Sequence, residues 1–358
     1  MDKTDESRRT TRRPRLSLAA IGSVAAAALL ASACATDKAA ADLTKPLPTS
    51  VAPGAAISAA VADVKVALDA GRIPQLPFKV TGWPNVTAGP DVIQAFKGGS
   101  VDLAANAFIP SIQAHAQNLD TRIVAVIVKS RPTQELATAP GSGIRSLKDL
   151  RGKKIAYSPG QTQGNVVLQT LRNEGLTPKD VDLVQLNSPQ FLTALQGKQV
   201  DAAPLGEPTL TKYLTQYRSE GAVGLHTDAV DALSVLWAPT SALADDKKLS
   251  AITEFVKTWA RTKVWEWEHP DQWIDDYYVK NQGVSAADGR RIVDSIERPY
   301  FPEDWGDAIK WGQQTIDLIT ASAGAFGGKS FDAAPLFDRR FEKVAADAVS
   351  AQYRTKPA

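Results

Sequence analysis

Short apolar runs alternate with amphipathic segments between residues 55 and 240, and this pattern predicts an α/β fold. Apolar runs predict strands at 55–61, 78–83, 122–129, 134–139, 181–186, 200–203 and 233–238, with another near Ile155. Helical spacing predicts helices at 63–70, 90–97, 166–173 and 190–195. Beyond residue 250 the pattern becomes helical, at 252–267, 271–280, 286–296, 305–321 and 336–349. Between residues 153 and 203 the order strand, helix, strand, helix, strand predicts a parallel sheet.

A repeated segment divides this α/β pattern into two halves. Residues 95–104 read AFKGGSVDLA and residues 194–203 read ALQGKQVDAA. In each copy a helix is predicted to end at a glycine, Gly98 or Gly197, in the left-handed conformation, and a buried strand follows. The repeat indicates two similar lobes, although any two α/β units could share such a pattern. Ligands of open α/β sheets lie beyond the carboxyl ends of the strands, here at 106–108 and 206–208.

The N-terminal residues have the features of an export signal. Five arginines lie within the first 15 residues, an apolar run follows from Leu16 to Leu30, and 31–33 are small. The apolar run is too short for a comfortable permanent span of a bilayer. Residues 1–33 are therefore predicted to be a lipoprotein signal peptide and 34–50 a tether. Cys34 would be the lipidated first residue of the mature chain, but an ordinary secretory signal and twin-arginine export remain alternatives.

Composition restricts the partners of the mature chain. Removal of residues 1–33 would leave 35 basic and 36 acidic residues, so the basic character of the whole chain comes from the signal. A nearly neutral chain gives no reason to expect nucleic-acid binding. Cys34 is the only cysteine, so disulfide bonds cannot contribute to the fold. Six of the eight tryptophans follow residue 250, where either packing or stacking on a flat ligand would explain them.

Four motifs resemble the extracytoplasmic solute-binding proteins of ABC importers, in the nitrate, taurine and aliphatic sulfonate-binding (SsuA/THI5-like) family. They are AFKGGSVDLAANAFIP at 95–110, SLKDLRGKKIAYSPGQTQ at 146–163, GLTPKDVDLVQL at 175–186 and ALQGKQVDAAPLGEPTL at 194–210. The resemblance implies a type 2 periplasmic-binding-protein fold, with two α/β lobes joined by two crossing strands and a helical C-terminal region. Lobe I would comprise residues 50–140 plus 237–358, and lobe II residues 141–236.

The resemblance also implies a ligand cleft between the lobes. Its first-lobe and crossing positions would be Asp63, Trp83, Asn85, Asn106, Phe108 and Arg131, and its second-lobe positions Gln161, Thr162, Gln163, Asn165 and Glu207. A helix N-terminus following Gly160 favours an anion, and Arg131 is suited to pair with a sulfonate or carboxylate. Glu207 would bind a ligand amine or pair with a basic residue at the hinge. Gly164 stands where the family often has histidine, so the solute need not be an alkyl sulfonate.

The expected function is that of a lipid-anchored receptor, held on the extracytoplasmic face of the cell membrane. It would capture a small anionic or zwitterionic solute by hinge closure and deliver it, as a monomer, to an ABC permease. The alternatives are an enzyme of the pyrimidine-precursor type on the same fold and a ligand sensor for a signalling receptor. The three histidines stand in unlike contexts, and no nucleophile triad or metal-binding motif is present, so no catalysis, metal or cofactor is expected.

Overall fold

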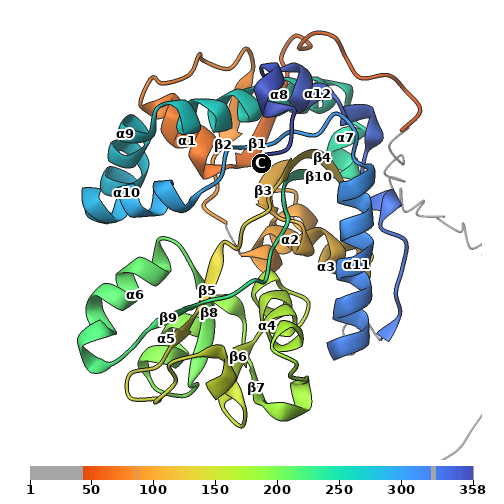
Figure 1. Cartoon of the computed structure of the whole chain (residues 1–358). Coiled ribbons are helices and arrows are strands. Elements are labelled where there is room, and N and C mark those ends of the chain that lie inside the picture. Colours follow the sequence, from red (N-terminus) through yellow and green to blue (C-terminus); the bar gives the residue numbers. More distant parts are fainter. Residues whose placement is uncertain (1–42, 87, 324–327, 358) are drawn as a thin grey trace, which may run out of the picture. The chain divides into compact units, whose positions relative to one another are not determined.

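The computed structural model describes residues 43–86, 88–323 and 328–357, which fall within one compact unit, Ala39–Ala358. The predicted signal peptide, Cys34 and the first part of the tether lie outside the described residues. None of the helices in the described part of the chain is long and apolar enough to cross a membrane. Two five-stranded sheets with flanking helices form the two lobes (Figure 1).

The sheet of lobe I has the strand order β2-β1-β3-β10-β4. Its first three strands are parallel, and β10 runs antiparallel between β3 and β4. A strand returning from lobe II therefore enters the middle of this sheet, whereas the parallel strands predicted between residues 153 and 203 belong to the sheet of lobe II, where they are parallel. The strands are β1 (Ala56–Ala60), β2 (Lys79–Gly82), β3 (Leu103–Ala107), β4 (Thr121–Val128) and β10 (Leu233–Pro239), and the helices between them are α1 (Ala62–Asp69), α2 (Gly89–Lys97) and α3 (Ile109–Ala116).

The sheet of lobe II repeats this arrangement in the order β7-β6-β8-β5-β9. Strands β7, β6 and β8 are parallel, and β5 is antiparallel to both of its neighbours. The strands are β5 (Gln134–Thr138), β6 (Lys154–Tyr157), β7 (Asp182–Gln185), β8 (Ala202–Gly206) and β9 (Gly224–His226). The helices are α4 (Thr162–Asn173), α5 (Phe191–Gln196) and α6 (Thr209–Tyr217). The matching strand orders confirm the prediction of two similar lobes.

The aspartate of the sequence repeat has the same structural role in both lobes. The Asp102 carboxylate accepts a hydrogen bond from the backbone N–H of Ser58 at 2.9 Å, and Asp201 accepts one from Lys154 at 2.8 Å. Each aspartate therefore ties the strand that follows it to the neighbouring parallel strand. The left-handed conformation predicted at the two glycines occurs one residue later in each copy. Gly98 and Gly197 are right-handed (φ −79° in both), and the next residues are left-handed.

The helices beyond residue 240 pack mainly on lobe I. They are α7 (Thr240–Leu243), α8 (Asp246–Glu268), α9 (Pro270–Trp273), a π-helix (Ile274–Asn281), α10 (Ala286–Ser295), α11 (Gly306–Ala323) and α12 (Val344–Asp347). Helix α8 packs against β1 and α1, whereas α11 also contacts α4 of lobe II. The single helix predicted at 336–349 is wrong: short 3-10 turns at 334–336 and 339–341 precede the four-residue helix α12. Their apolar side chains instead pack into the core of lobe I.

Two extended segments, 129–133 and 227–232, join the lobes. The N–H of Lys129 donates a hydrogen bond to the carbonyl of Ala232 at 2.7 Å, so the segments lie side by side. The Lys129 ammonium is 3.6 Å from the buried carboxylate of Asp231. Burial raises the pKa of Asp231, while Lys129 opposes that shift. The crossing is therefore held by a backbone hydrogen bond and a buried ion pair. The exact residue limits predicted for the lobes stay a prediction.

Candidate ligand-binding site

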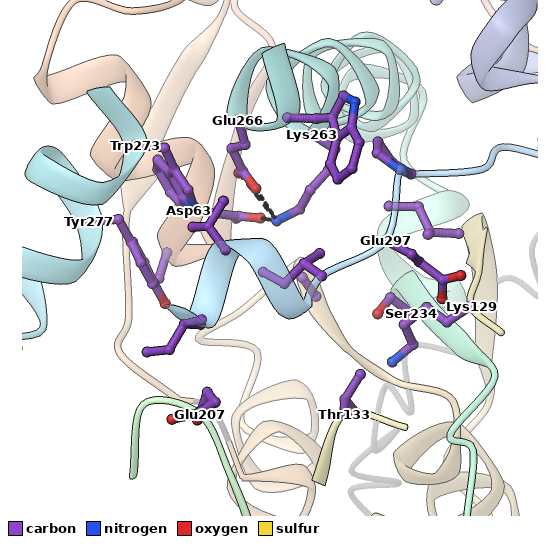
Figure 2. Close-up of a pocket in the computed structure, with 18 of the residues that line it drawn as sticks. Asp63, Lys129, Thr133, Glu207, Ser234, Lys263, Glu266, Trp273, Tyr277 and Glu297 are labelled. Atoms are coloured by element: carbon purple, nitrogen blue, oxygen red, sulfur yellow. Dashed lines mark hydrogen bonds and ion pairs between the residues drawn. The ribbon is translucent and has the colours of Figure 1, made fainter. Parts of the chain in front are cut away.

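A cavity of about 510 Å³ lies at the crossing of the two lobes. Most of its wall comes from lobe I: α1, the loop after β2, the C-terminal end of α8, the π-helix and residues 292–299. Thr133 and Glu207 belong to the lobe II side, and Figure 2 shows them opposite the upper wall of the cavity. This volume is in the range of pockets that hold small organic ligands.

Four of the predicted site residues line the cavity: Asp63, Asn85, Arg131 and Glu207. Arg131 is exposed, and among the described residues its guanidinium forms no ion pair. Its backbone N–H is fixed by the Glu297 carboxylate at 3.1 Å, and the same carboxylate accepts from Ser130 N–H at 2.6 Å. The crossing segment is thus held at its backbone, which leaves the Arg131 side chain available for an anion.

Glu207 connects the two lobes. Its Oε1 lies 2.9 Å from Nη2 of Arg291 on α10, and its Oε2 accepts a hydrogen bond from the Thr211 N–H at 3.1 Å. The sequence left two roles open for Glu207: binding a ligand amine or pairing with a basic residue. In the structure Glu207 is paired with a basic residue, Arg291. The negative charge of this carboxylate is balanced by the positive charge of Arg291, which reduces its repulsion of an anionic ligand in the cavity.

Three predicted residues of lobe I do not line this cavity. Trp83 packs with the main core of lobe I. Asn106 accepts a hydrogen bond from Nε1 of Trp237 at 3.0 Å, and the fully buried ring of Phe108 is stacked on Phe337 at 5.7 Å. All three lie at or next to strand ends, as predicted, but each is packed against another element: Trp83 against Phe255 of α8, Asn106 against β10 and Phe108 against the C-terminal segment. Ligand contact by these three residues stays a prediction.

The other predicted positions of lobe II lie at the N-terminus of α4, and this helix begins at Thr162 rather than at the predicted residue 166. They are Gln161, Thr162, Gln163 and Asn165. Oγ of Ser188 lies 2.6 Å from Oε1 of Gln161 and 2.8 Å from Oε1 of Gln163. Thr162 is buried, and Asn165 is 1% exposed without a hydrogen-bond partner for its side-chain oxygen or nitrogen. None of these four predicted residues lines the cavity described above. They form a separate polar cluster, whose contact with a ligand stays a prediction.

Gly164 is required for this α4 N-terminus to form. A Cβ at this position would lie 2.0 Å from the carbonyl oxygen of Ser158 and 3.2 Å from the Tyr157 ring. Any side chain would therefore collide with backbone. In this structure the chain turns at Gly164 too tightly for a histidine or any other side chain.

A largely buried cluster of three charges, with side chains 12 to 25% exposed, forms the upper wall in Figure 2; Asp63 was predicted as a site residue, whereas Lys263 and Glu266 were missed. Nζ of Lys263 lies 2.5 Å from Oδ2 of Asp63 and 3.0 Å from Oε2 of Glu266. Burial raises the pKa of Glu266 to about 7, with Lys263 opposing the shift and Asp63 adding to it. Burial alone would lower the pKa of Lys263, but the two carboxylates outweigh it and raise that pKa. We call Asp63, Lys263 and Glu266 the charged triad.

Aromatic and aliphatic side chains form a further part of the cavity wall. Trp273 and Tyr277 are stacked with ring centroids 4.5 Å apart, and Trp267 also lines the cavity. Of the tryptophans considered from the sequence, Trp259 and Trp305 are fully buried in the core, whereas Trp267 and Trp273 line the cavity. Packing is therefore confirmed for Trp259 and Trp305, whereas stacking on a flat ligand stays a prediction for the tryptophans that line the cavity.

The described residues contain no group of three or more His, Cys, Asp and Glu side chains that could hold a metal ion. The arrangement at the cavity is instead one of fixed charges, hydrogen-bonding groups and exposed apolar surface. Such a site can bind and orient an organic ion.

Two α/β lobes with crossing segments and a cavity between them define a protein of the periplasmic-binding-protein fold. The alkanesulfonate-binding protein SsuA from Xanthomonas axonopodis pv. citri, solved bound to MOPS, has the same fold, with a TM-score of 0.67 and 22% identity over 80% of this chain and 99% of that one. A family model described as NMT1/THI5 like matches residues 85–272. The chain belongs to this family, as its motifs indicated.

Curated relatives in two bacteria carry the same name, "Putative aliphatic sulfonates-binding protein". The Escherichia coli (strain K12) protein is 30% identical over 43% of this chain and 47% of its own length, so the match spans about half of that relative. The Bacillus subtilis (strain 168) protein is 22% identical over 74% of this chain and 78% of its own length. The similarity thus reaches across both lobes in the second relative.

Proposed function

We propose that this protein is the extracytoplasmic solute-binding component of an ABC importer and that its solute carries a sulfonate-like anionic group. The observation that supports this most directly is the cavity at the lobe crossing, lined by Asn85 and by Arg131, whose guanidinium forms no ion pair within the part of the chain that the structure describes. The names of the curated relatives support the same class of solute. No covalent step is required, so the protein is proposed to be a receptor and not an enzyme.

The proposed mechanism is hinge closure about segments 129–133 and 227–232. A solute that contacts both lobes stabilises the closed arrangement by its higher affinity for it. Glu207 and Thr133 would supply the contacts from the lobe II side, and Arg131 would anchor the anion at the hinge. The closed receptor would then dock on the permease and release its solute.

Isothermal titration calorimetry of the purified protein with alkyl and aryl sulfonates, taurine and nitrate tests the proposal. Arg131→Ala should weaken sulfonate binding about 10- to 100-fold, as expected for a charge-assisted hydrogen-bonded pair. The matched control is Arg261→Ala, which removes an exposed arginine of α8 that does not line the cavity. No binding of any sulfonate, or equal effects of the two substitutions, would contradict the proposed anion site.

Asn165→Ala distinguishes the cavity from the α4 cluster. Because Asn165 does not line the cavity, its substitution should leave sulfonate affinity within about twofold if the open cavity is the whole site. A large loss would instead show that the bound solute reaches the N-terminus of α4, as predicted from the sequence. A melting temperature measured for the same variant separates loss of fold from loss of binding.

We also propose that Cys34 is acylated and anchors the receptor to the membrane. The proposal depends on the sequence of residues 1–34 alone. Cys34→Ala should move the protein from the membrane fraction to the soluble extracytoplasmic fraction and abolish incorporation of labelled fatty acid. Retention in the membrane without label would indicate an uncleaved signal as the anchor.

A further inference from the structure

The cavity exposes apolar surface that a small inorganic anion or taurine could not cover. Trp267 is 38% exposed and Ile296 is 45% exposed, and these are the large hydrophobic side chains that remain exposed in the described part of the chain. Both line the same cavity. Single exposed apolar residues are common on protein surfaces, but a pair that shares one concave site is typical of a binding surface.

Other aromatic side chains line the same cavity. The Trp273 and Tyr277 rings are stacked at an interplanar angle of 14°, and both belong to the cavity wall. Val293 of α10, which is half-buried, also lines this cavity. Aromatic side chains favour flat or cyclic partners, through burial of area and through ring stacking.

The size of the cavity leads to the same class of solute. Its volume of about 510 Å³ is several times that of nitrate or taurine, each of which has fewer than about ten non-hydrogen atoms. Such a ligand could pair with Arg131 and still leave Trp267 and Ile296 in water. A solute with both an anionic group and a ring would use the charge at the hinge and the apolar wall together.

We infer that the solute carries a hydrocarbon ring, as in an aryl or cycloalkyl sulfonate, and that Trp267 and Ile296 determine this specificity. The inference rests on the proposed function, since it assumes an anionic solute in this cavity. It adds that the apolar part of the solute, and not the anion alone, provides selectivity. Nitrate and short sulfonates would bind weakly.

Calorimetric titration with benzenesulfonate and methanesulfonate tests this inference. The two probes share the anionic group and differ in the ring. The purified wild-type protein should bind benzenesulfonate at least about tenfold more tightly, because the ring buries apolar area on the wall. Trp267→Ala should weaken benzenesulfonate binding by about tenfold while leaving methanesulfonate within about twofold.

The matched control is Trp311→Ala on α11, because Trp311 packs against Phe108 and does not line the cavity. It should preserve the preference for the ring. Ile296→Ala, in an exposed position, is a second variant that should also reduce the preference if Trp267→Ala fails to fold. Melting temperatures verify folding in each case.

The possible outcomes separate the two proposals. Equal wild-type affinity for both probes would overturn the ring specificity and leave the sulfonate receptor standing. Equal weakening of both probes by Trp267→Ala would show a structural role and also overturn the assignment. Binding of neither probe would overturn the ring inference together with the sulfonate-type function.

Discussion

Replacing Lys263 by methionine would remove the only cation of the charged triad while keeping most of the volume of its side chain. Nζ of Lys263 lies 2.5 Å from Asp63 and 3.0 Å from Glu266. At an effective dielectric constant of about 20, each attraction amounts to about 6 kcal/mol before desolvation is considered. Desolvation of the ammonium offsets a large part of this, so the net loss of unfolding free energy should be about 3 to 5 kcal/mol.

The pH dependence of this loss follows from Glu266. Burial raises the pKa of the folded-state carboxyl to about 7 from an ordinary value of 4.5. Between these pH values the folded protein binds more protons than the unfolded chain, so stability falls as pH rises. Without Lys263, which lowers the pKa of Glu266, that pKa should rise further. The loss caused by Lys263→Met should therefore be larger at pH 8 than at pH 5.

Urea unfolding followed by circular dichroism at pH 5 and pH 8 measures both quantities. Lys257→Met is the matched control, since Lys257 belongs to the same helix and lies 3.0 Å from Glu254 in a more exposed pair. The control should lose less than about 1 kcal/mol. A Lys263→Met variant that lost no more than this control, or lost the same amount at both pH values, would refute the account of the triad as a buried network.

Three further predictions concern neighbouring features. Glu266→Gln should remove the titration of this side chain and so reduce the loss of stability between pH 5 and pH 8, measured by urea unfolding, by about 2 to 3 kcal/mol; the buried carboxyl of Asp231, whose pKa is also raised, should keep its own part of the loss, and an unchanged slope would assign the whole loss to another group. Gly164→Ala should cost at least about 2 kcal/mol by the same measurement, because its Cβ would overlap the Ser158 carbonyl. Gly82→Ala, with 3.8 Å of clearance, should cost much less. Glu297→Ala should speed amide hydrogen exchange at Ser130 and Arg131, whose N–H groups lose their acceptor; unchanged exchange would mean that Glu297 does not hold the crossing.

The sequence predicted the α/β elements well because their apolar runs are short and are bounded by glycine or proline. Strands β1, β4, β5 and β10 lie within a residue or two of the predicted ranges. The region after residue 330 was predicted poorly. Its apolar residues bury themselves through short turns against lobe I, and helical spacing alone does not distinguish such turns from a helix.

The candidate site could be predicted only in part, since it depends on contacts between distant segments. Asp63, Asn85, Arg131 and Glu207 follow strands or lie at the crossing, and they could be located from strand order. Lys263 and Glu266 carried no such signal. An i,i+3 pair of opposite charges usually marks a solvent-exposed helix face. Only the packing of α8 against α1 turns this pair toward Asp63 and buries it.

The placement of lobe II in the chain has a consequence for engineering and evolution. Strands β4 and β10 are antiparallel neighbours, with Val128 opposite Leu233, so all of lobe II occupies the position of the turn in a β-hairpin. The ends of this insertion are joined by the hydrogen bond between Lys129 and Ala232. Lobe II is therefore a contiguous cassette whose entry and exit points coincide. Exchange of this cassette between family members would replace one face of the binding site in a single recombination event and leave the frame of lobe I intact.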